Sequence, residues 1–493
     1  MQRTIFKTLF LLFLFNTQLQ GQNYPYPQSV SFNHCIKPGG ITSEIMNASV
    51  GQFYDYWKQK YLKTRLVSLP GGHYVAGEIT GNPQGFKPLG TSEGLGYGMI
   101  ITAIMTGYDK DARMLFDGLF KTARAFRSKT NPALMGWVVA DDKKAQGAFG
   151  SAIDGDLDIA YALILAHLQW TSNGSIHYFN EAKAIIEALE TTNITLSKRL
   201  NLGDWQSKST STTRPSDWMT AHMQLFHTAS GKRIWLDLRD NTYDLVEALQ
   251  ANYAATTGLL PDFAWDNPIK PVNPDFLEGS NDGNFYYNAC RVPLRLILDY
   301  AHNDEPRAKI ALERMMDWII IQTSNKPALV KAGYSLRGEV LPGSHYFDAV
   351  FVAPLVAAAI SDEKYQHFLT AGWPLLTRSK SNYFADTINL LCQLVISGNW
   401  WAPKLQLVNS PDLHLQQGSL VFPNPVVDRL FLRPDGLANG MAQIFNLVGQ
   451  EVLSFNPHET QYVDVGHLKS GVYIFKAFSI MQNRHVTAKF TKW

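Results

Sequence analysis

The feature of this sequence that most limits its fold is a helical spacing of apolar residues that continues from about residue 45 to about residue 400. Twelve blocks show this spacing, and the connections between them are rich in Gly, Pro, Asn and Ser. The blocks are 50–63, 94–107, 110–127, 156–170, 177–191, 217–229, 233–255, 289–302, 305–323, 346–360, 363–370 and 382–397. Twelve helices suit six stacked hairpins, so we predict an all-α domain.

Two of these blocks predict different surroundings. The block 156–170 is apolar on nearly every side after its first turn, which suits only a helix that is buried all round. The block 110–127 intersperses charged residues, such as Lys121 and Arg124, with apolar ones. We therefore predict two layers of helices, with 156–170 in the inner layer and 110–127 in the outer layer.

The helical spacing stops after Trp401, and a polar connection follows over 404–419. Residues 420–493 contain short segments in which apolar and polar side chains alternate, as they do in the strands of a half-buried sheet. We predict a helical domain over 23–403, a linker over 404–419 and a small C-terminal β-sandwich over 420–493.

The N-terminus has the pattern of a secretory signal peptide. Two positive charges precede an apolar run from Thr8 to Phe15, and polar residues follow up to Gln22. The run is too short to span a bilayer, and no later uncharged apolar stretch reaches the required length of about 18 residues. We expect residues 1–22 to be a signal peptide, and the protein to be exported without a stable membrane span.

The charge balance argues against partners that are held by charge. With 44 basic and 42 acidic residues the formal net charge is +2, so we expect neither nucleic acid nor an anionic membrane as a partner. The 13 histidines show no paired metal spacing, and the three cysteines, Cys35, Cys290 and Cys392, lie far apart. We therefore predict no metal, no cofactor and a neutral partner.

Three segments place carboxylates among glycine and aromatic residues. They are 91–99, 151–160 and 274–279. Hydrolysis of a glycosidic bond needs such a set, because one protonated carboxyl must stand beside the leaving oxygen while an ionised one acts from the opposite side. The second group either attacks directly or activates water, and the segments leave both routes open.

Each carboxylate also has a purely structural explanation. Glu93 at a helix start would interact favourably with the helix dipole, and Asp156 and Asp158 could cap a helix. Glu278 could be a solvated loop charge. A calcium loop counted from Asp154 is excluded, because it lacks Gly at its sixth position and Glu at its twelfth.

Two further features carry an energetic cost. Gly94, Gly96 and Gly98 alternate at a predicted helix start, where each costs about 0.5–1 kcal/mol relative to Ala. The cost suggests that something approaches the backbone closely, and substrate is a natural candidate. Asp154 and Asp158 would lie one turn apart and repel each other, which a site that uses one of them would explain.

These segments resemble the motifs of glycoside hydrolase family 8. The segment 152–170 is similar to the signature of that family, and 92–99 is similar to its acid-bearing motif. Further similarities follow in the family's order at 214–218, 258–263, 287–295 and 397–401, so the resemblance covers roughly residues 45–402. It implies an (α/α)6 barrel and an inverting mechanism, with Glu93 as the general acid and Asp154 holding the sugar at the cleavage subsite.

The main departure from the family is Asn288, where the best-known members carry an Asp as the catalytic base. An amide cannot accept a proton from water. A subgroup with chitosanases and lichenan-cutting enzymes has Asn there and takes its base from a Glu in a preceding loop, a place that Glu278 fits. Asp282 is the reserve candidate for the base, and Asp262 is expected to be a pocket or structural acid. A smaller departure, Ile153, concerns packing.

Several further residues are candidates for binding the sugar chain. The polar ones are Asp156, Arg214, Asn288 and Arg291, and the aromatic ones that could stack on sugar rings are Tyr97, Trp137, Trp205, Trp218, Trp265, Tyr287 and Tyr346. For each aromatic residue taken alone, packing in the core is at least as common an explanation.

The C-terminal module resembles a type A sorting domain of the type IX secretion system. The resemblance rests on 420–430, 444–452, 468–474 and 489–492. It implies passage through the periplasm, and release to the medium or attachment at the cell surface, in a bacterium of the Bacteroidetes lineage. The competing interpretation is a carbohydrate-binding module, which we disfavour because Phe431, Phe445, Tyr462, Tyr473 and Phe475 take alternating positions expected to face the core.

The predicted activity is therefore hydrolysis of a β-1,4-linked polysaccharide, with lichenan-type β-glucan narrowly ahead of chitosan. Chitosan carries ammonium groups, and Asp262, Asp266, Asp275 and Asp282 around Glu278 could bind them. The rival from another class is a non-catalytic glycan-binding protein on an inactive barrel, which Asn288 would suggest.

Overall fold

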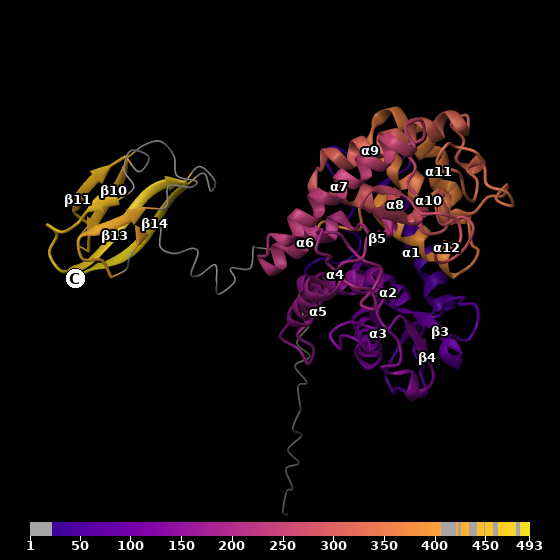
Figure 1. The fold of residues 1–493 in the computed structure, drawn as a ribbon, viewed down its shortest axis with the longest axis horizontal. Helices are drawn as coiled ribbons and strands as arrows, with labels where there is room; N and C mark the ends of the chain where they lie inside the picture. The colour runs from indigo at the N-terminus through magenta and orange to yellow at the C-terminus, as the bar shows by residue number, and fades with distance from the viewer. Residues whose placement is uncertain are drawn as a thin grey trace, which may run out of the picture. The chain divides into compact units, whose positions relative to one another are not determined.

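The structure of the protein is a computed structural model. It describes residues 22–405, 421–422, 425–432, 441–447, 449–456, 462–479 and 484–493. The predicted signal peptide and nearly all of the predicted linker lie outside these residues. The chain divides into two compact units, Met1–Gln406 and Leu407–Trp493, which Figure 1 shows as a helical unit and a unit of strands.

Twelve α-helices form the first unit within 22–405, and each predicted block overlaps one of them. They are α1 (Ser43–Tyr61), α2 (Ser92–Ile104), α3 (Ala112–Ala125), α4 (Ile153–Trp170), α5 (Tyr178–Thr192), α6 (Thr220–Ser230), α7 (Ile234–Tyr253), α8 (Val292–Asn303), α9 (Pro306–Gln322), α10 (Ala349–Ala358), α11 (Gln366–Arg378) and α12 (Tyr383–Ile396). The prediction was wrong about the end of α11, which continues through Pro374 although proline usually ends a helix.

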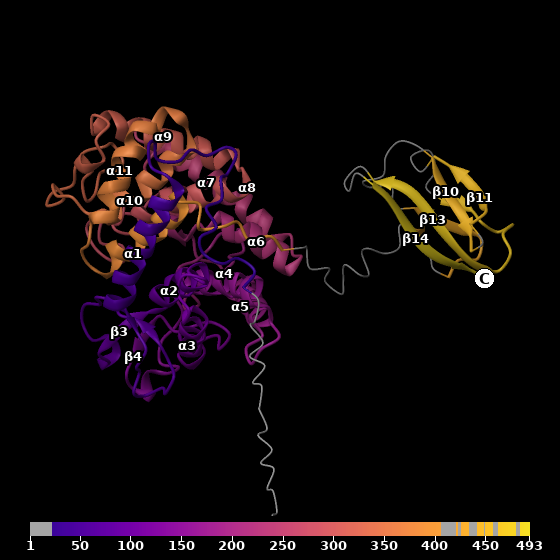
Figure 2. The same cartoon turned by 180° about the vertical axis from the view of Figure 1, so that it is seen from behind.

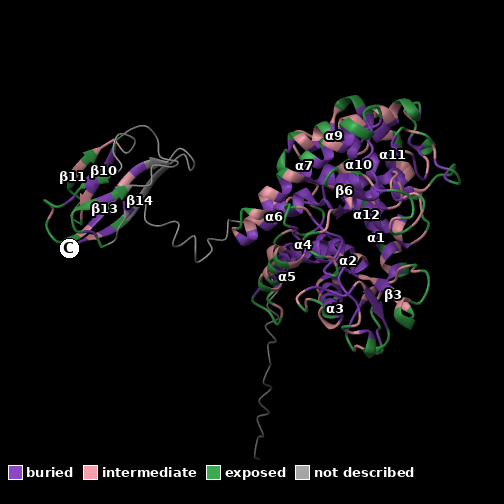
Figure 3. Cartoon of the chain, in the orientation of Figure 1, coloured by how far each residue is buried: buried purple, intermediate pink, exposed green. Residues whose placement is uncertain are grey.

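The even-numbered helices form a closed ring. Each of α2, α4, α6, α8, α10 and α12 contacts the next, and α12 contacts α2. The odd-numbered helices lie against this ring, so that α3 packs on α2, α5 on α4, α7 on α6, α9 on α8, α11 on α10 and α1 on α12. Figure 2 shows the same helices from behind, and Figure 3 shows how completely the ring helices are buried. The predicted inner place of α4 and outer place of α3 are confirmed.

The glycines of α2 allow close packing within the protein. A Cβ atom at Gly96 would lie 2.7 Å from Cβ of Asp158 on α4, and one at Gly94 would lie 2.8 Å from the hydroxyl of Tyr383 on α12. Gly98 is as crowded. The expectation that substrate approaches this backbone was therefore wrong, because neighbouring elements of the ring occupy the space.

A segment at the N-terminus, residues 23–36, lies across one end of the ring. Its backbone N–H groups donate to carbonyl oxygens at the C-terminal ends of four ring helices. The pairs are Asn23 to Gln169 at α4, Tyr26 to Thr106 at α2, Val30 to Gly398 at α12 and Ile36 to Ile360 at α10. The ring of Tyr24 stacks on Trp401 with centroids 4.1 Å apart. We call residues 23–36 the N-terminal strap.

Short strands and a small apolar cluster lie beside the opposite, N-terminal ends of the ring helices. Strand β3 (Pro88–Thr91) pairs with β4 (Val138–Ala140), and β6 (Ala264–Asp266) pairs with β5 (Thr212–Thr213) and β7 (Ile269–Pro271). A separate cluster of Leu202, Phe263 and Val272 is covered by Trp265 and Phe276. This satellite cluster supports the loop that carries Glu278. One further pair, β1 (Leu62–Lys63) with β2 (Tyr74–Val75), completes the described strands of this unit.

The second unit consists of two antiparallel sheets. One has the order β11 (Glu451–Phe455), β10 (Ala442–Asn446), β13 (Gly471–Ser479) and β14 (Arg484–Lys492), and the other has the order β12 (Tyr462–Asp464), β9 (Arg429–Leu432) and β8 (Val421–Phe422). The predicted strands are confirmed. The expectation that all five aromatic residues face the core was wrong for three of them. Phe431 and Tyr462 are 38% and 40% exposed and contact each other across β9 and β12, and Phe445 is only partly buried, next to the buried Ile444 on β10.

No helix among the described residues is long and apolar enough to cross a bilayer. Within the same residues, no cluster of three or more His, Cys, Asp or Glu side chains has the geometry to hold a metal ion.

The close approach of α2 and α4 predicts the effect of a single methyl group. Gly96→Ala should lower the free energy of unfolding by about 1–3 kcal/mol, because the added Cβ would overlap Asp158 in a packed ring. Gly39→Ala is the control, since its Cβ would lie no closer than 3.3 Å to its neighbours, the side chains of Thr370 and Gln366. Urea unfolding of both variants measures the difference, and equal stabilities would contradict the packing argument.

Candidate active site

Three of the predicted residues meet where the ring helices begin. Glu93 lies in the first turn of α2, and Asp154 lies in the first turn of α4. Arg291 ends the short turn η4 (Ala289–Arg291), which leads directly into α8. The hydroxyl of Thr91 accepts the N–H of Gly94 at 3.0 Å and caps α2, which fixes where Glu93 leaves the helix.

The Arg291 guanidinium connects these residues. Its Nη1 donates to Glu93 Oε2 at 2.6 Å and to Asp154 Oδ2 at 3.2 Å. Its Nη2 donates to the Ser216 hydroxyl and to Asn288 Oδ1, both at 2.9 Å. Arg291 is only 1% exposed, so its charge depends on these partners for stabilisation.

A second pair lies one turn further along the same two helices. Arg295 on α8 donates to both oxygens of Asp158 on α4, at 2.9 and 3.2 Å, and His222 contacts Asp158 at 2.9 Å. Asp154 is paired with Arg291 in the same way. The repulsion predicted between Asp154 and Asp158 is therefore offset by arginines at each carboxylate, Arg214 and Arg291 at Asp154 and Arg295 at Asp158.

The surroundings of Glu93 favour its protonated form. Burial raises the pKa of its carboxyl to about 7, and the negative charge of Asp154 adds to this, although Arg291 acts in the opposite direction. The Tyr383 hydroxyl donates to Glu93 Oε1 at 3.3 Å. A carboxyl with this pKa can give up a proton near neutral pH.

Asp154 has the opposite tendency. Burial acts to raise the pKa of its carboxyl, but Arg214 and Arg291 outweigh burial and hold the pKa below its usual value. Nη2 of Arg214 lies 3.1 Å from Asp154 Oδ2, and Oδ1 accepts the N–H of Gly155. Asp154 therefore loses its proton at a lower pH than Glu93 does.

Asn288 connects this group to Glu278. Its Oδ1 accepts from Arg291 and, at 3.4 Å, from Arg214, so its amide Nδ2 must point the other way. Nδ2 donates to Glu278 Oε2 at 2.8 Å. Glu93, Asp154 and Glu278 thus belong to one hydrogen-bonded network.

The two other acids considered for the base are occupied by the backbone. Asp262 Oδ1 accepts the N–H groups of Tyr286 and Ala289, at 3.0 and 2.6 Å, and burial raises the pKa of Asp262 to about 7. Asp282 accepts three backbone N–H groups from residues 277–279. Both carboxyl groups hold loops in place.

A cleft of about 760 Å³, including solvent at its mouth, lies beside Glu278. Its lining includes Trp137, Trp205, Arg214 and Leu277. Trp205 is 53% exposed, and a Cβ atom at Gly203 would lie only 2.5 Å from its Nε1, so the indole rests directly on the backbone. One edge of the indole thus lies against Gly203, and the ring stays half exposed beside the cleft.

Other predicted binding residues lie away from the cleft surface. Trp218 is 3% exposed and donates from Nε1 to the Thr213 hydroxyl, and Tyr97 is fully buried. Asp156 is also fully buried, and its Oδ1 accepts the N–H of Met135. The expectation that these three residues contact sugar was therefore wrong, because their side chains are buried inside the protein.

The remaining aromatic candidates occupy two places. Trp265 packs edge to face on Phe276 in the satellite cluster. Tyr287 is half-buried, and its hydroxyl lies 2.8 Å from that of Tyr346 and donates to Asp348 at 3.0 Å. Tyr346 is 45% exposed. Of these three residues, Tyr346 has an exposed ring, and Tyr287 lies beside it.

The sequence analysis missed three residues of the network. Tyr383 contacts Glu93 from α12, 290 positions away in the chain, and no local motif marks it. Ser216 and Asp217 lie inside the motif 214–218, and Asp217 accepts from Arg214 Nε at 2.8 Å. That motif was the available signal for both.

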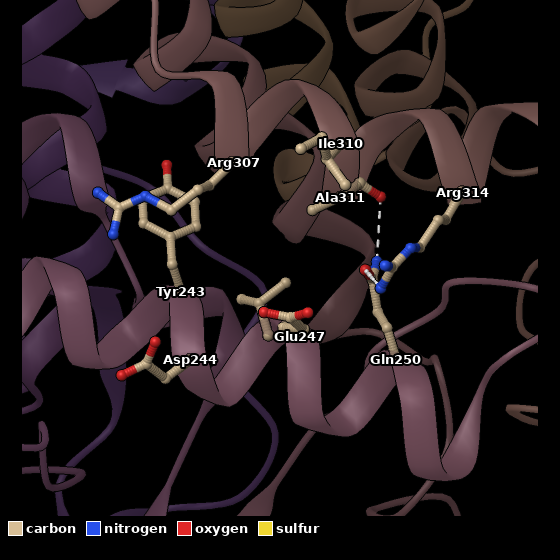
Figure 4. Close-up of a pocket in the computed structure, with 9 residues that line it drawn as sticks. Tyr243, Asp244, Glu247, Gln250, Arg307, Ile310, Ala311 and Arg314 are labelled. Atoms are coloured by element: carbon tan, nitrogen blue, oxygen red, sulfur yellow. Dashed lines mark hydrogen bonds between the residues drawn. The ribbon is translucent and has the colours of Figure 1, made fainter.

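A separate pocket lies between α7 and α9 (Figure 4). Its lining includes Tyr243, Glu247, Gln250, Arg307 and Arg314, and Arg314 donates to Gln250 at 3.2 Å. None of the predicted site residues lines it. The candidate active site is therefore the cleft beside Glu278 with the network behind it.

Known relatives have names that agree with this chemistry. An endoglucanase of Bacillus sp. (strain KSM-330) is 49% identical over 381 residues, which are 77% of this chain and 82% of the relative. A beta-glucanase of Niallia circulans is 38% identical over 399 residues, 80% of this chain and 95% of the relative. The apo structure of a beta-1,3-1,4-glucanase from Paenibacillus sp. X4 superposes with a TM-score of 0.72 at 38% identity, covering 78% of this chain and all of that one.

Two family matches together span most of the chain. Residues 420–491 match the secretion system C-terminal sorting domain. Residues 54–398, which contain Glu93, Asp154, Glu278 and Arg291, match glycosyl hydrolases family 8. The chain therefore belongs to glycosyl hydrolase family 8 and ends in a sorting domain for secretion.

Proposed function

We propose that this glycoside hydrolase is a secreted, endo-acting and inverting enzyme that cleaves β-1,4-linked glucan of the lichenan type. The observation that carries the proposal is one network that contains a carboxyl with a pKa of about 7, Glu93, and an exposed carboxylate, Glu278. The names of the endoglucanase and beta-glucanase relatives support the substrate.

In the proposed mechanism a single displacement breaks the glycosidic bond. Glu93 gives its proton to the leaving oxygen, and Glu278 takes a proton from the water that attacks the anomeric carbon on the opposite face. Asn288 occupies only Oε2 of Glu278 among the contacts of the described residues. Oε1 is the oxygen that would receive the water's proton.

Asp154 would bind the sugar at the point of cleavage. Its two arginine partners keep it ionised, so it offers acceptor oxygens to sugar hydroxyl groups without competing for the proton of Glu93. Its negative charge also helps to keep Glu93 protonated before the reaction.

Trp205 would be the main stacking platform for the glucan chain. Its indole is fixed on Gly203 and exposed on the cleft side, and Trp137 lines the same cleft. An aromatic face fits the apolar face of an unsubstituted pyranose ring. Tyr287 with Tyr346, and Arg214 beside Asp154, would extend the binding surface.

The acids near Glu278 favour neutral glucan over chitosan. Asp262 and Asp282 are engaged by backbone N–H groups, and Asp266 Oδ2 accepts from the Ser197 hydroxyl at 3.1 Å. Of the four acids that could have bound ammonium groups, only Asp275 has no side-chain hydrogen bond among those of the described residues. A polycationic substrate therefore has few free carboxylates beside the base.

We also propose the finer architecture and the route of export. The closed helical ring is taken as an (α/α)6 barrel over 23–403, and the two C-terminal sheets as a β-sandwich over 420–493 that follows a linker at 404–419. Residues 1–22 would direct the chain to the periplasm, and the type IX machinery would recognise the sorting domain. The non-catalytic alternative is disfavoured because both Glu93 and Glu278 are present in one network.

The roles of the two carboxyl groups predict the effect of removing each. Glu93→Gln and Glu278→Gln should each lower kcat on lichenan by about 100- to 10,000-fold, because neither amide can transfer the proton. Reducing-end release measures the rate, and proton NMR of the parent should show the α anomer first. Full activity of Glu278→Gln would exclude it as the base.

The raised pKa of Glu93 predicts the alkaline side of the pH profile. The acid must be protonated, so kcat/KM should fall above pH about 7, by about tenfold for each further pH unit. Retention of Glu93→Gln on immobilised lichenan is the control and should not change over that range. A rate that stays constant to pH about 9 would contradict the assignment of Glu93.

The occupied acids predict the substrate preference. The protein should release reducing ends from lichenan and, more slowly, from carboxymethylcellulose, with no turnover of chitosan or xylan. Trp205→Ala should raise KM for lichenan by about tenfold, because a stacked ring contributes roughly 1–2 kcal/mol. Preferred turnover of chitosan would reverse the substrate assignment, and inactivity on all four would favour the glycan-binding alternative.

A further inference from the structure

Three consecutive backbone N–H groups around Glu278 point at one carboxylate. The N–H of Leu277 donates to Asp282 Oδ2 at 2.6 Å, and that of Glu278 donates to the same oxygen at 3.0 Å. The N–H of Gly279 donates to Oδ1 at 3.0 Å. One side chain thus determines the course of the backbone on both sides of Glu278.

Asp282 is itself held firmly. It is 3% exposed, its N–H donates to the Gly279 carbonyl at 3.2 Å, and its own carbonyl accepts the N–H of Phe263 at 2.9 Å. Phe263 belongs to the satellite cluster, on which Phe276 also packs. The carboxylate is therefore anchored to a buried part of the protein.

The loop that it holds has little other support. Leu277 is 52% exposed, and Glu278 is exposed as well. Asp275 at its start adopts a φ of 58°, a conformation that a non-glycine residue keeps only when its surroundings impose it. Charge-assisted hydrogen bonds to one buried carboxylate are the strongest restraint on residues 277–279 among the described contacts.

We infer that Asp282 is a positioning residue that fixes the backbone of Glu278, while Asn288 fixes its side chain. The inference rests on the proposed function of Glu278 as the base. Two restraints are needed because Asn288 holds only Oε2, and a shift of the backbone would carry Oε1 away from the attacking water. A misplacement of about 1 Å can lower the rate by about 100-fold.

The chemistry of the site explains why an aspartate is required. A carboxylate offers two acceptor oxygens to three N–H groups, whereas an asparagine offers one oxygen and turns an NH2 group toward the remaining donors. Asp282→Asn is therefore nearly the same size but cannot hold the loop. Asp282→Glu keeps both oxygens on a longer side chain.

The test uses the full chain and lichenan as substrate. Asp282→Asn should lower kcat by about 100-fold with KM changed less than twofold, and Asp282→Glu should recover about tenfold of that loss, which leaves its kcat about tenfold below that of the parent. Asp362→Asn is the matched control, because its carboxylate accepts the backbone N–H of Lys364 on a different loop, and its kcat should equal that of the parent. Thermal unfolding is recorded for all variants.

Sodium azide separates positioning from proton transfer. In Glu278→Gly, azide can attack the anomeric carbon in place of water, so a C–N bond forms, the glycosidic C–O bond breaks, and Glu93 protonates the leaving oxygen. Azide should therefore restore turnover in Glu278→Gly and yield the α-glycosyl azide. It should restore nothing in Asp282→Gly, where Glu278 is still present but misplaced.

Three results would overturn the inference. The first is a kcat for Asp282→Asn within twofold of that of the parent. The second is rescue of Asp282→Gly by azide, which would make Asp282 the base. The third is an equal loss of kcat in Asp282→Asn and Asp282→Glu. If Asp282→Asn does not fold, kcat is measured on Asp282→Glu instead. We expect Asp282→Glu to have a lower kcat at unchanged KM, and full activity of this variant would contradict the inference. A parent inactive on every glycan would refute the proposed function, whereas an inactive Glu278→Gln beside a fully active Asp282→Asn would refute only the role of Asp282.

Discussion

The guanidinium of Arg291 is the interaction on which the site depends. It is almost fully buried and would be costly to hold there without partners, and its charged partners are Glu93, the proposed acid, and Asp154, the carboxylate proposed to bind the sugar. The same charge lowers the pKa of Asp154 and limits how far burial raises that of Glu93. Burial outweighs the arginine at Glu93 and raises its pKa, whereas Arg214 and Arg291 together outweigh burial at Asp154 and lower its pKa.

This arrangement repeats one turn deeper in the ring. Arg295 and Asp158 are the counterparts of Arg291 and Asp154, and both pairs join α8 to α4. Removing one partner of a buried pair leaves an uncompensated charge, which costs far more than the pair contributes. The deeper pair therefore makes the spacing of the ring helices, and with it the geometry of the upper pair, difficult to change.

Periodicity predicted the helices because a buried helix face has a regular spacing along the chain. It could not predict that α11 continues through Pro374, since proline usually ends a helix and the contacts of α11 with α10 join residues that lie apart in the sequence. The family motifs predicted that Glu93, Asp154 and Glu278 belong to one site. Whether a tryptophan can contact substrate depends on its burial, which the sequence does not show. The sequence does not separate Trp205 from Trp218, yet Trp205 is 53% exposed beside the cleft, whereas Trp218 is 3% exposed and donates to the Thr213 hydroxyl. Tyr383 reaches Glu93 across 290 positions, a contact that no local pattern could indicate.

The N-terminal strap sets the order in which the helical unit can be completed during synthesis. Gln28, near the start of the described chain, donates its N–H to the side chain of Asn399, 371 positions later, and the neighbouring Val30 docks on Gly398. These partners are the last part of the unit to be made. The part of the strap around Gln28 and Val30 must therefore wait for these partners until α12 has been produced, and its contacts are formed against a large loop-closure entropy. A ring that is closed by contacts between residues 28–30 and 398–399 therefore stays open until the last helix of the unit has been synthesised.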